Sequence, residues 1–245
     1  MFLSSGALRR PNAFLSSSAV NRIWKVSGDQ QSIEREPAST PAVVAPGAFP
    51  NATGSDDEVE RQDEDAEDEL DTEAASRRAS ALARVRKFGD PVLRTRALSV
   101  ERFDEVLRSE VARMGELMSD AVGVGLAATQ VGAVHRLLVY RVQRQASVAA
   151  LVNPVIEWAG KEEEIGEEGC LSLPAVLVDV ERPIYVRVRA CNEHGEPLMI
   201  EASGLEARVI QHEIDHLDGV LILDRTTREQ RKQAMRALRE AQEAA

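Results

Sequence analysis

The sequence predicts an α+β fold from the pattern of its apolar residues. After Phe103, apolar residues recur at steps of three and four, which is typical of one face of a helix. Residues 184–189 alternate between apolar and polar side chains, as a half-buried strand does. Helical patterns return after Gly204 and near Thr226. A helix, then several strands, then further helices favours α+β architecture.

The chain of 245 residues is long enough for one domain and a tail. We expect residues 1–78 to form a disordered leader and acidic linker, and residues 79–245 to form the folded domain. Residues 1–28 contain no Asp or Glu, and residues 29–55 are rich in Pro, Ala, Ser and Gly. Such segments bury too little apolar surface to offset chain entropy. An organelle transit peptide is the alternative interpretation of residues 1–28.

The formal net charge of −11 comes from one segment. Residues 56–73 hold twelve acidic residues and one base, Arg61, so the remaining 29 acidic and 29 basic residues balance. Without a basic excess, sequence-specific nucleic-acid binding is not expected. No apolar run approaches the roughly 18 residues of a membrane-spanning helix. Two cysteines cannot form a disulfide scaffold, which fits a reducing compartment.

The first elements of the folded domain are a turn at residues 86–91 and a long helix. This helix starts near Phe103, runs for about five turns and ends at Gly123. Its apolar face comprises Phe103, Val106, Leu107, Val111, Met114, Leu117, Met118 and Ala121.

Strands and two more helices follow. A turn is predicted at residues 192–197 and a helix over residues 204–217. The third helix starts near Thr226, where Thr226 or Thr227 can cap it and Glu229 can complete a capping box. Segments rich in β-branched, aromatic or other apolar residues predict strands at residues 136–142, 150–157, 184–189 and 198–202.

The strongest chemical signal is the pentapeptide His-Glu-Ile-Asp-His at residues 212–216. On a helix, His212 and His216 lie one turn apart on one face, so both imidazoles can bind one metal ion. Glu213 can reach a water on that metal. Two surface histidines on an amphipathic helix are the alternative. The opposite side of the helix is an apolar stripe of Ile210, Ile214 and Leu217.

A catalytic metal site needs a third protein ligand. No histidine follows His216, so the candidates are Cys170 and a downstream carboxylate such as Glu240. A Cys170 thiolate is the softer ligand, although this residue also fits as a small buried side chain or a partner for Cys191. Glu240 would complete the ligand set of a zinc metalloprotease, but it lies in a charged terminal segment. The residues alone leave both ligand sets open.

A third segment, residues 123–130, places Gly123 and Gly125 at alternate positions. Glycines there allow close backbone approach or a positive φ. The segment lacks the Gly-Lys-Ser/Thr end of a phosphate-binding loop. Taken alone, it predicts a turn at the end of a helix.

The three segments together, in this order, resemble the peptide deformylase family. The family pattern is G-φ-G-φ-A-A-x-Q, then E-G-C-φ-S, then H-E-φ-D-H, where φ is apolar. This chain carries the three patterns at residues 123–130, 168–172 and 212–216 without a mismatch. The resemblance extends from about residue 85 to residue 225 and includes the terminal helix.

The resemblance implies an α+β fold of mixed, mostly antiparallel strands around a central metal-binding helix, with a C-terminal helix. It implies one divalent metal ion held by Cys170, His212 and His216, with water as the fourth ligand. Fe²⁺ is the expected metal, Zn²⁺ is the second choice, and Ni²⁺ or Co²⁺ can substitute. The implied reaction removes the N-formyl group from the methionine of new polypeptides and releases formate.

The same resemblance implies a role for each catalytic residue. Glu213 takes a proton from the attacking water and delivers it to the departing amine. The Gln130 side-chain amide and the backbone N–H of Leu171 stabilise the oxyanion together with the metal. Arg182 orients the substrate backbone or pairs with Glu168. The expected substrate-binding residues are Gly123, Val124, Gly125, Leu126, Val209 and Arg182, and the apolar wall for the methionine comprises Val124, Leu126, Leu171 and Val209.

The expected partner is an N-formylmethionyl nascent peptide, with no membrane and no sequence-specific nucleic acid. Residues 226–245 carry a mild basic excess, which suggests a transient ribosome contact or, more simply, a solvated helix face. We expect a monomer in a bacterial cytoplasm, or in a mitochondrion or plastid if residues 1–28 are a transit peptide. A zinc metalloprotease and a non-catalytic metal-binding protein are the competing functions.

Overall fold

The computed structural model describes residues 71–243. The predictions for the leader, for a transit peptide and for most of the acidic segment lie outside these residues. A helix at residues 71–84 precedes the labelled elements. None of the described helices is long and apolar enough to cross a membrane. The elements that follow are η2 (Pro91–Arg94), α2 (Glu105–Asp120), β1 (Gly125–Ala127), η3 (Ala128–Val131), β2 (Leu137–Tyr140), β3 (Ala149–Ala159), β4 (Glu163–Cys170), β5 (Leu173–Pro183), β6 (Tyr185–Cys191), β7 (Pro197–Ser203), α3 (Gly204–Leu217), α4 (Ile222–Arg225) and α5 (Arg228–Glu243).

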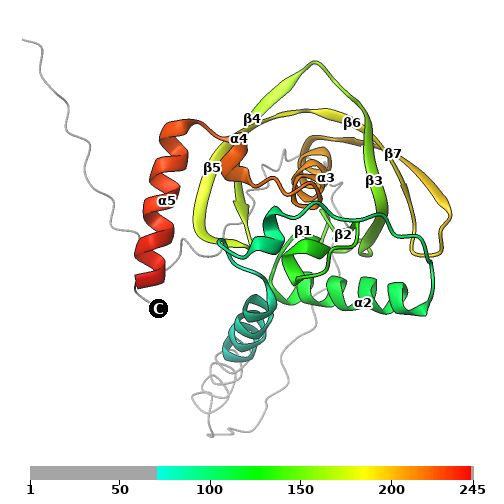
Figure 1. Cartoon of the computed structure of the whole chain (residues 1–245), viewed down its shortest axis with the longest axis horizontal. Coiled ribbons are helices and arrows are strands. Elements are labelled where there is room, and N and C mark those ends of the chain that lie inside the picture. The colour runs from blue at the N-terminus through cyan, green and yellow to red at the C-terminus, as the bar shows by residue number, and fades with distance from the viewer. Residues whose placement is uncertain (1–70, 244–245) are drawn as a thin grey trace, which may run out of the picture.

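The strands form two antiparallel sheets on different sides of α3 (Figure 1). One sheet has the order β1-β2-β3-β6-β7, and the other is the hairpin of β4 and β5. One isolated parallel bridge joins Leu98 to His135. The predicted α+β class with mostly antiparallel strands and a central helix is confirmed.

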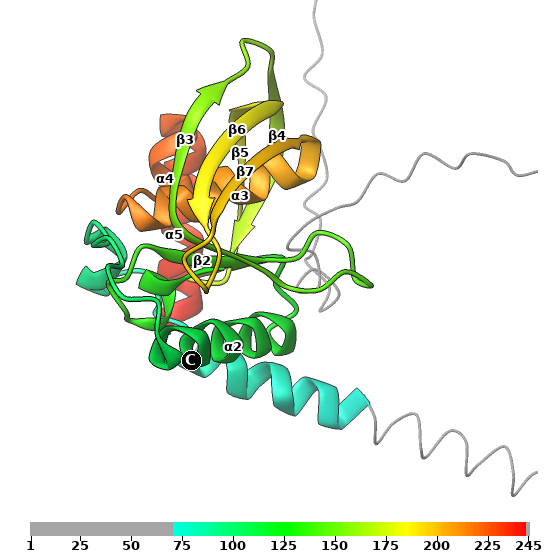
Figure 2. The ribbon, with the colours of Figure 1, turned by 90° about the vertical axis from the view of Figure 1, so that its right-hand side faces the viewer.

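The helices cover different parts of this framework. Helix α2 packs against β1 and β2, whereas α5 packs against β5. Figure 2 shows β3, β6 and β7 as a curved layer and α2 at its lower end. The hydrophobic core is therefore divided: one cluster lies between α2 and the first strands, a second between α3 and the five-stranded sheet, and a third between β5, α4 and α5.

The elements predicted after residue 191 agree closely with the structure. Helix α3 spans Gly204–Leu217, as the sequence predicts. The turn before β7 is held by Asn192, whose side chain accepts from the backbone N–H groups of His194 and Glu196. In α5, the cap is Thr227, whose hydroxyl accepts from the N–H of Gln230. Gln230, rather than Glu229, therefore occupies the third helical position.

Three features of the structure differ from prediction. Helix 71–84 starts before residue 79, where the sequence predicts the folded domain to begin; Ala81 and the following Val85 are buried in the first core cluster. Val106, assigned to the apolar face of α2, is 69% exposed because it lies beside the Asp104 cap on the outer side of the helix. The hairpin of β4 and β5 was not predicted, because acidic residues interrupt the alternation in β4.

Glycines mark both ends of α3. After α3 ends, Gly219 has φ +73 and its N–H donates to the carbonyl of His216, while the N–H of Val220 donates to the carbonyl of Asp215. This is a Schellman cap, which requires a left-handed residue. A Cβ on Gly219 would lie 2.6 Å from the Arg94 carbonyl oxygen, whereas Gly204, at φ +54, has open space around its Cβ position.

This contrast makes the two glycines a matched pair. Gly204→Ala should lower the free energy of unfolding by about 1 kcal/mol, the cost of placing an L-residue in the left-handed region. Gly219→Ala should lower it by about 3 kcal/mol, because a backbone clash adds to the same cost. Urea unfolding measures both values. Equal losses for the two variants would contradict the role given to the Arg94 contact.

Candidate metal centre

Helix α3 is buried on nearly all sides, although much of its sequence is polar. Buried polar groups are stable only when they are hydrogen-bonded or otherwise paired. The partners of these side chains therefore define the site. The polar residues of α3 that are buried are Arg208, Gln211, His212, Glu213, Asp215 and His216.

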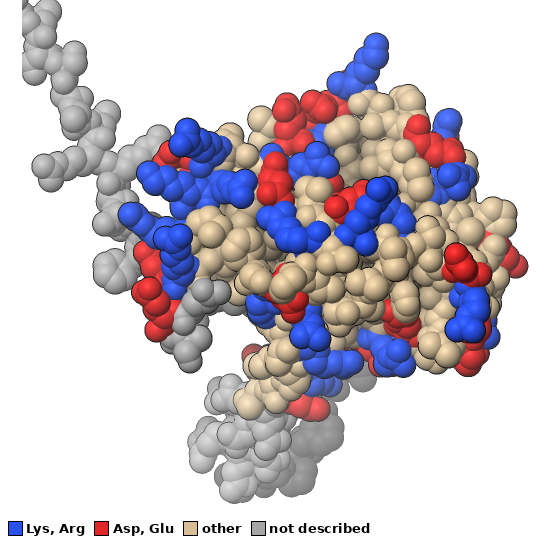
Figure 3. Space-filling model, viewed as in Figure 1, with Lys and Arg blue, Asp and Glu red and all other residues tan. Residues whose placement is uncertain are grey.

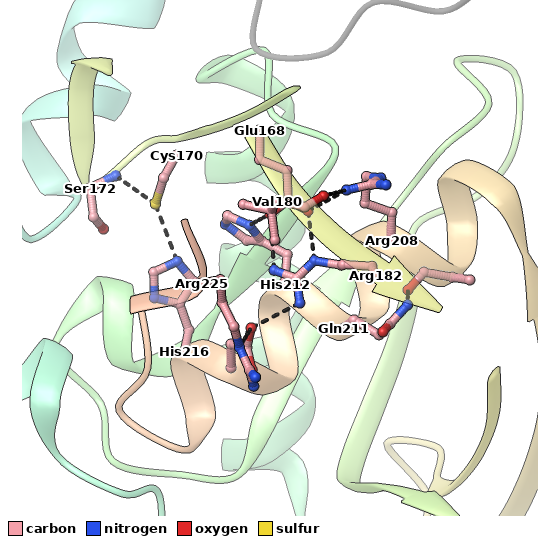
Figure 4. A network of polar contacts seen from close by, with 12 residues as sticks. Glu168, Cys170, Ser172, Val180, Arg182, Arg208, Gln211, His212, His216 and Arg225 are labelled. Carbon is pink, nitrogen blue, oxygen red and sulfur yellow. Dashed lines mark hydrogen bonds and ion pairs between the residues drawn. The ribbon is translucent and has the colours of Figure 1, made fainter. Parts of the chain in front are cut away.

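The central partner is Glu168, a fully buried carboxylate on β4 (Figure 4). One oxygen accepts from Arg182 Nε at 2.6 Å and from Arg208 Nη1 at 2.9 Å. The other oxygen lies 2.9 Å from both Arg182 Nη2 and His212 Nδ1. Burial alone would raise the pKa of Glu168, but the hydrogen bonds from His212 and Arg182 hold that pKa well below its ordinary value.

These contacts orient the ring of His212. An ionised carboxylate only accepts hydrogen bonds, so Nδ1 of His212 carries the hydrogen that points at Glu168. The lone pair of the neutral imidazole is then on Nε2, which is the arrangement found for metal-binding histidines with a carboxylate partner. Glu168 therefore prepares His212 to bind a cation.

Arg182 joins this cluster to the next turn of α3. Each of its three nitrogens donates to a buried carboxylate, two to Glu168 and one to Asp215 at 2.9 Å. Asp215 also accepts from Arg225. Arg182 is 4% exposed, so its pair with Glu168 is not a surface ion pair. All three nitrogens of Arg182 donate to protein carboxylates, so the structure contains the predicted pair with Glu168, and the substrate-orienting role stays a prediction.

Cys170, at the end of β4, lies beside both histidines. Its Sγ is 3.2 Å from Nε2 of His216 (Figure 4). One donor atom from each of Cys170, His212 and His216 lies within 4.8 Å of the other two, and all three residues are buried. The structure thus brings together the three predicted metal ligands, while Glu240, the alternative third ligand, lies exposed on α5.

The electrostatics of the trio suit a divalent cation. Burial would raise the pKa of the Cys170 thiol, but the two adjacent histidines lower it well below its ordinary value. One thiolate and two imidazoles form a soft, singly charged donor set that matches Zn²⁺, Fe²⁺ and similar ions. Because the three donors already converge, these residues fit a metal ion without rearrangement of the chain.

Gln130 is held at the edge of this trio. Its Oε1 accepts from the backbone N–H of Ala127 at 2.8 Å. Its Nε2 then points to Ser172 Oγ at 3.3 Å and to Cys170 Sγ at 3.6 Å. Since η3 fixes the backbone of Gln130, the amide N–H₂ is presented to the site as a donor. Leu171, the other predicted donor, follows Cys170 directly and is 6% exposed.

Glu213 faces β1 and is almost fully buried. Burial raises its pKa to about 7, although His212 and His216 oppose the shift. Its Oε2 atom has no hydrogen-bond partner among the described residues. A Cβ on Gly125 would lie 2.3 Å from Oε1 of Glu213, so only glycine allows β1 to pass this close to the carboxylate. The sequence predicts that glycine in this segment allows a close approach to the backbone, and in the structure the group that approaches Gly125 is the side chain of Glu213.

The residues predicted to contact substrate differ in accessibility. Val124 is partly buried and packs against the second core cluster. A Cβ on Gly123 would lie 3.1 Å from Leu171 Cδ1, so Gly123 borders Leu171. Leu126 and Val209 are 0% exposed and belong to separate core clusters. These two side chains stabilise the core in this conformation and have no exposed surface toward a ligand.

Sequence reasoning missed most of the polar residues behind the ligands. Glu168 and Asp215 lie inside matched motifs but were given no role at the metal. Arg208 lies one helical turn before His212, at the spacing that predicts a shared face. Ser172, whose backbone N–H donates to Cys170 Sγ at 3.4 Å, gave no separate signal, and neither did Arg225.

Comparison with known sequences agrees with this geometry. Residues 82–232 match the family model described as polypeptide deformylase. A peptide deformylase from Acidothermus cellulolyticus is 49% identical over 162 residues, which cover 66% of this chain and 88% of that protein. One from Thermotoga neapolitana is 51% identical over 144 residues, covering 59% of this chain and 87% of that protein.

Solved structures give the same result. A peptide deformylase from Legionella pneumophila superimposes with a TM-score of 0.63 at 38% identity, covering 65% of this chain and 95% of that one. One from Synechococcus elongatus, in complex with actinonin, gives a TM-score of 0.61 at 43% identity, covering 62% of this chain and 85% of that one. By its sequence, its fold and the arrangement of its motifs, the chain belongs to the peptide deformylase family.

Proposed function

We propose that this chain is a metal-dependent hydrolase that removes the N-formyl group from the N-terminal formylmethionine of newly synthesised polypeptides. The products are formate and a free amino terminus. One observation carries the proposal: the thiol of Cys170 converges with His212 and His216 beside the buried carboxylate of Glu213. Family membership supports the same reaction.

The proposed cofactor is one divalent cation per chain, held by Cys170, His212 and His216. Fe²⁺ is the proposed native ion, and the same donors suit Zn²⁺, Ni²⁺ or Co²⁺. When bound, the cation supplies a Lewis acid that makes a water molecule nucleophilic near neutral pH and polarises the formyl carbonyl.

Glu213 is the proposed proton carrier. A general base works best when its pKa lies near the working pH, and burial brings the pKa of Glu213 into that range. Its carboxylate accepts a proton from the attacking water and later donates that proton to the departing amine. The close packing of Gly125 keeps the carboxylate from turning away from the site.

Gln130 and Leu171 are the proposed donors to the oxyanion. The Gln130 amide is fixed through its oxygen, so its nitrogen need not reorganise to meet developing negative charge. The backbone N–H of Leu171 is the second donor. Loss of one such donor typically costs about 3 kcal/mol of barrier. Gly123 and Val124 are proposed to line the substrate side of Leu171.

The proposed partner is a nascent N-formylmethionyl peptide, and the proposed site of action is the cytoplasm of a bacterial-type cell, or a mitochondrion or plastid. On the face shown in Figure 3, acidic and basic side chains are interspersed. This mixture of charges argues against sequence-specific nucleic-acid binding at that face. The basic side chains of α5 suit a solvated helix face or a transient ribosome contact. These side chains are Arg228, Arg231, Lys232, Arg236 and Arg239. A monomer is proposed as the simplest oligomeric state.

Two substitutions test the reaction. Glu213→Ala should retain stoichiometric metal but abolish formate release from a formyl-Met peptide, because the proton carrier is removed. Cys170→Ala should lose both metal and activity, because a ligand is removed. Protein prepared without oxygen, assayed for metal content and formate, measures both. Cys170→Ala protein that keeps its metal and activity would favour a metalloprotease-type ligand set, and metal-loaded wild-type protein that releases no formate would refute the proposal.

Gly125→Ala tests the positioning of Glu213. The added methyl group has no room beside the carboxylate and should displace it, so kcat/KM should fall by about 100-fold, as for loss of a general base. Metal content should not change. Gly160→Ala is the control, because a Cβ there meets its nearest neighbour at 3.4 Å, an ordinary contact distance. Unchanged kcat/KM in folded Gly125→Ala protein would contradict the prediction.

Glu168→Gln tests the orientation of His212. The amide cannot satisfy Arg182, Arg208 and His212 together, so metal affinity should fall by about 10- to 100-fold. The free energy of unfolding should drop by about 3 kcal/mol, because the buried guanidinium of Arg208 loses its counter-charge and that of Arg182 keeps only Asp215. Glu167→Gln, at the adjacent exposed position, is the control. Metal titration and urea unfolding give the two values, and identical behaviour of the two variants would disprove the role of Glu168.

A further inference from the structure

A lysine outside the catalytic set contacts the corner that carries Cys170. The ammonium of Lys87 donates to the backbone carbonyl of Leu171 at 3.1 Å. Backbone hydrogen bonds fix the chain on both sides of Lys87: the N–H of Arg86 donates to the Gln130 carbonyl at 2.7 Å, and the N–H of Phe88 donates to the Ser172 carbonyl at 2.9 Å. The position of Lys87 is therefore set by the same segments that form the site.

The carbonyl that Lys87 contacts belongs to the peptide group that faces the sulfur. The C=O of Leu171 and the N–H of Ser172 are the two ends of one amide. That N–H donates to Cys170 Sγ at 3.4 Å (Figure 4). A positive charge on the oxygen of an amide polarises it, which makes its N–H a stronger donor. The ammonium and the sulfur are thus connected through a single peptide group.

The environment keeps this connection effective. Lys87 is half-buried, and Leu171 and Ser172 are buried, so water screens the contact only in part. Burial lowers the pKa of Lys87, and the charge of the nearby Cys170 thiolate opposes that change.

We propose that Lys87 is a positioning residue that acts on Cys170 through the Leu171–Ser172 peptide group and withdraws electron density from the sulfur. This inference rests on the proposed metal centre. Hydrogen bonds to a ligand sulfur, and the charges behind them, tune the redox and Lewis-acid properties of a bound ion. Lys87 therefore makes the sulfur a weaker electron donor, which protects an Fe²⁺ form against oxidation.

The test uses the full-length protein loaded with Co²⁺, because sulfur-to-cobalt charge transfer reports the electron density on the sulfur directly. Lys87→Met keeps the length of the side chain but removes its charge, so the charge-transfer band should shift to longer wavelength. Lys87→Gln, which keeps a donor without a charge, should also shift it. Lys87→Arg restores the charge and should return the band toward the wild-type position. Lys161→Met, on an exposed lysine, is the control and should leave the band in place.

The Fe²⁺ forms provide a second readout. Lys87→Met and Lys87→Gln should lose iron(II) in air faster than wild-type protein, whereas Lys87→Arg should not. A folded Lys87→Met protein whose band and oxidation rate equal those of wild type would overturn the inference about Lys87 and leave the metal centre intact. Wild-type protein that shows no sulfur-to-cobalt band would overturn both the inference and the proposed ligand set.

Discussion

The Glu168 carboxylate, buried between two guanidinium groups and an imidazole, is the contact on which the site depends. It bonds directly to Arg208 and His212 of α3. Arg182 of β5 bridges it to Asp215 on the same helix. A buried carboxylate without such partners would be protonated or would destabilise the fold. Because its charge is compensated, Glu168 stays ionised and fixes the position of β4 against α3. Cys170, two residues further along β4, is thereby brought to the two histidines.

Several functional groups of the proposed reaction are consequently oriented by protein contacts rather than by a ligand. Glu168 sets the tautomer of His212, the backbone of Ala127 sets the direction of the Gln130 amide, and the packing of Gly125 limits the movement of Glu213. Such preorganisation lowers the cost of rearrangement during a reaction. It also explains why a helix with six buried polar residues can lie inside the core, since most of their polar atoms have partners. Two buried atoms of this helix lack a partner among the described residues: Nδ1 of His216 and Oε2 of Glu213, which belongs to the group proposed to carry protons.

The parts of this structure that sequence reasoning predicted are those encoded locally. The bounds of α3 follow from glycines and a helical period, and the ligand candidates follow from the spacing of His212 and His216 and from the family motifs. The hairpin of β4 and β5 was missed because its pairing is set by contacts between strands, and Glu163, Glu164 and Glu167 obscure its pattern. The burial of Leu126 and Val209 depends on which core cluster covers them, and the contact of Lys87 with Leu171 joins residues 84 positions apart. No local pattern encodes such contacts.

X-ray absorption spectroscopy of the protein loaded with one equivalent of Fe²⁺ or Zn²⁺ addresses the metal centre most directly. The convergence of Cys170, His212 and His216 predicts one sulfur at about 2.3 Å and two nitrogens at about 2.0–2.1 Å, with a light atom completing the shell. The sulfur contribution should disappear in the Cys170→Ala variant. A wild-type shell of nitrogen and oxygen alone would contradict the proposed ligand set and the chemistry built on it.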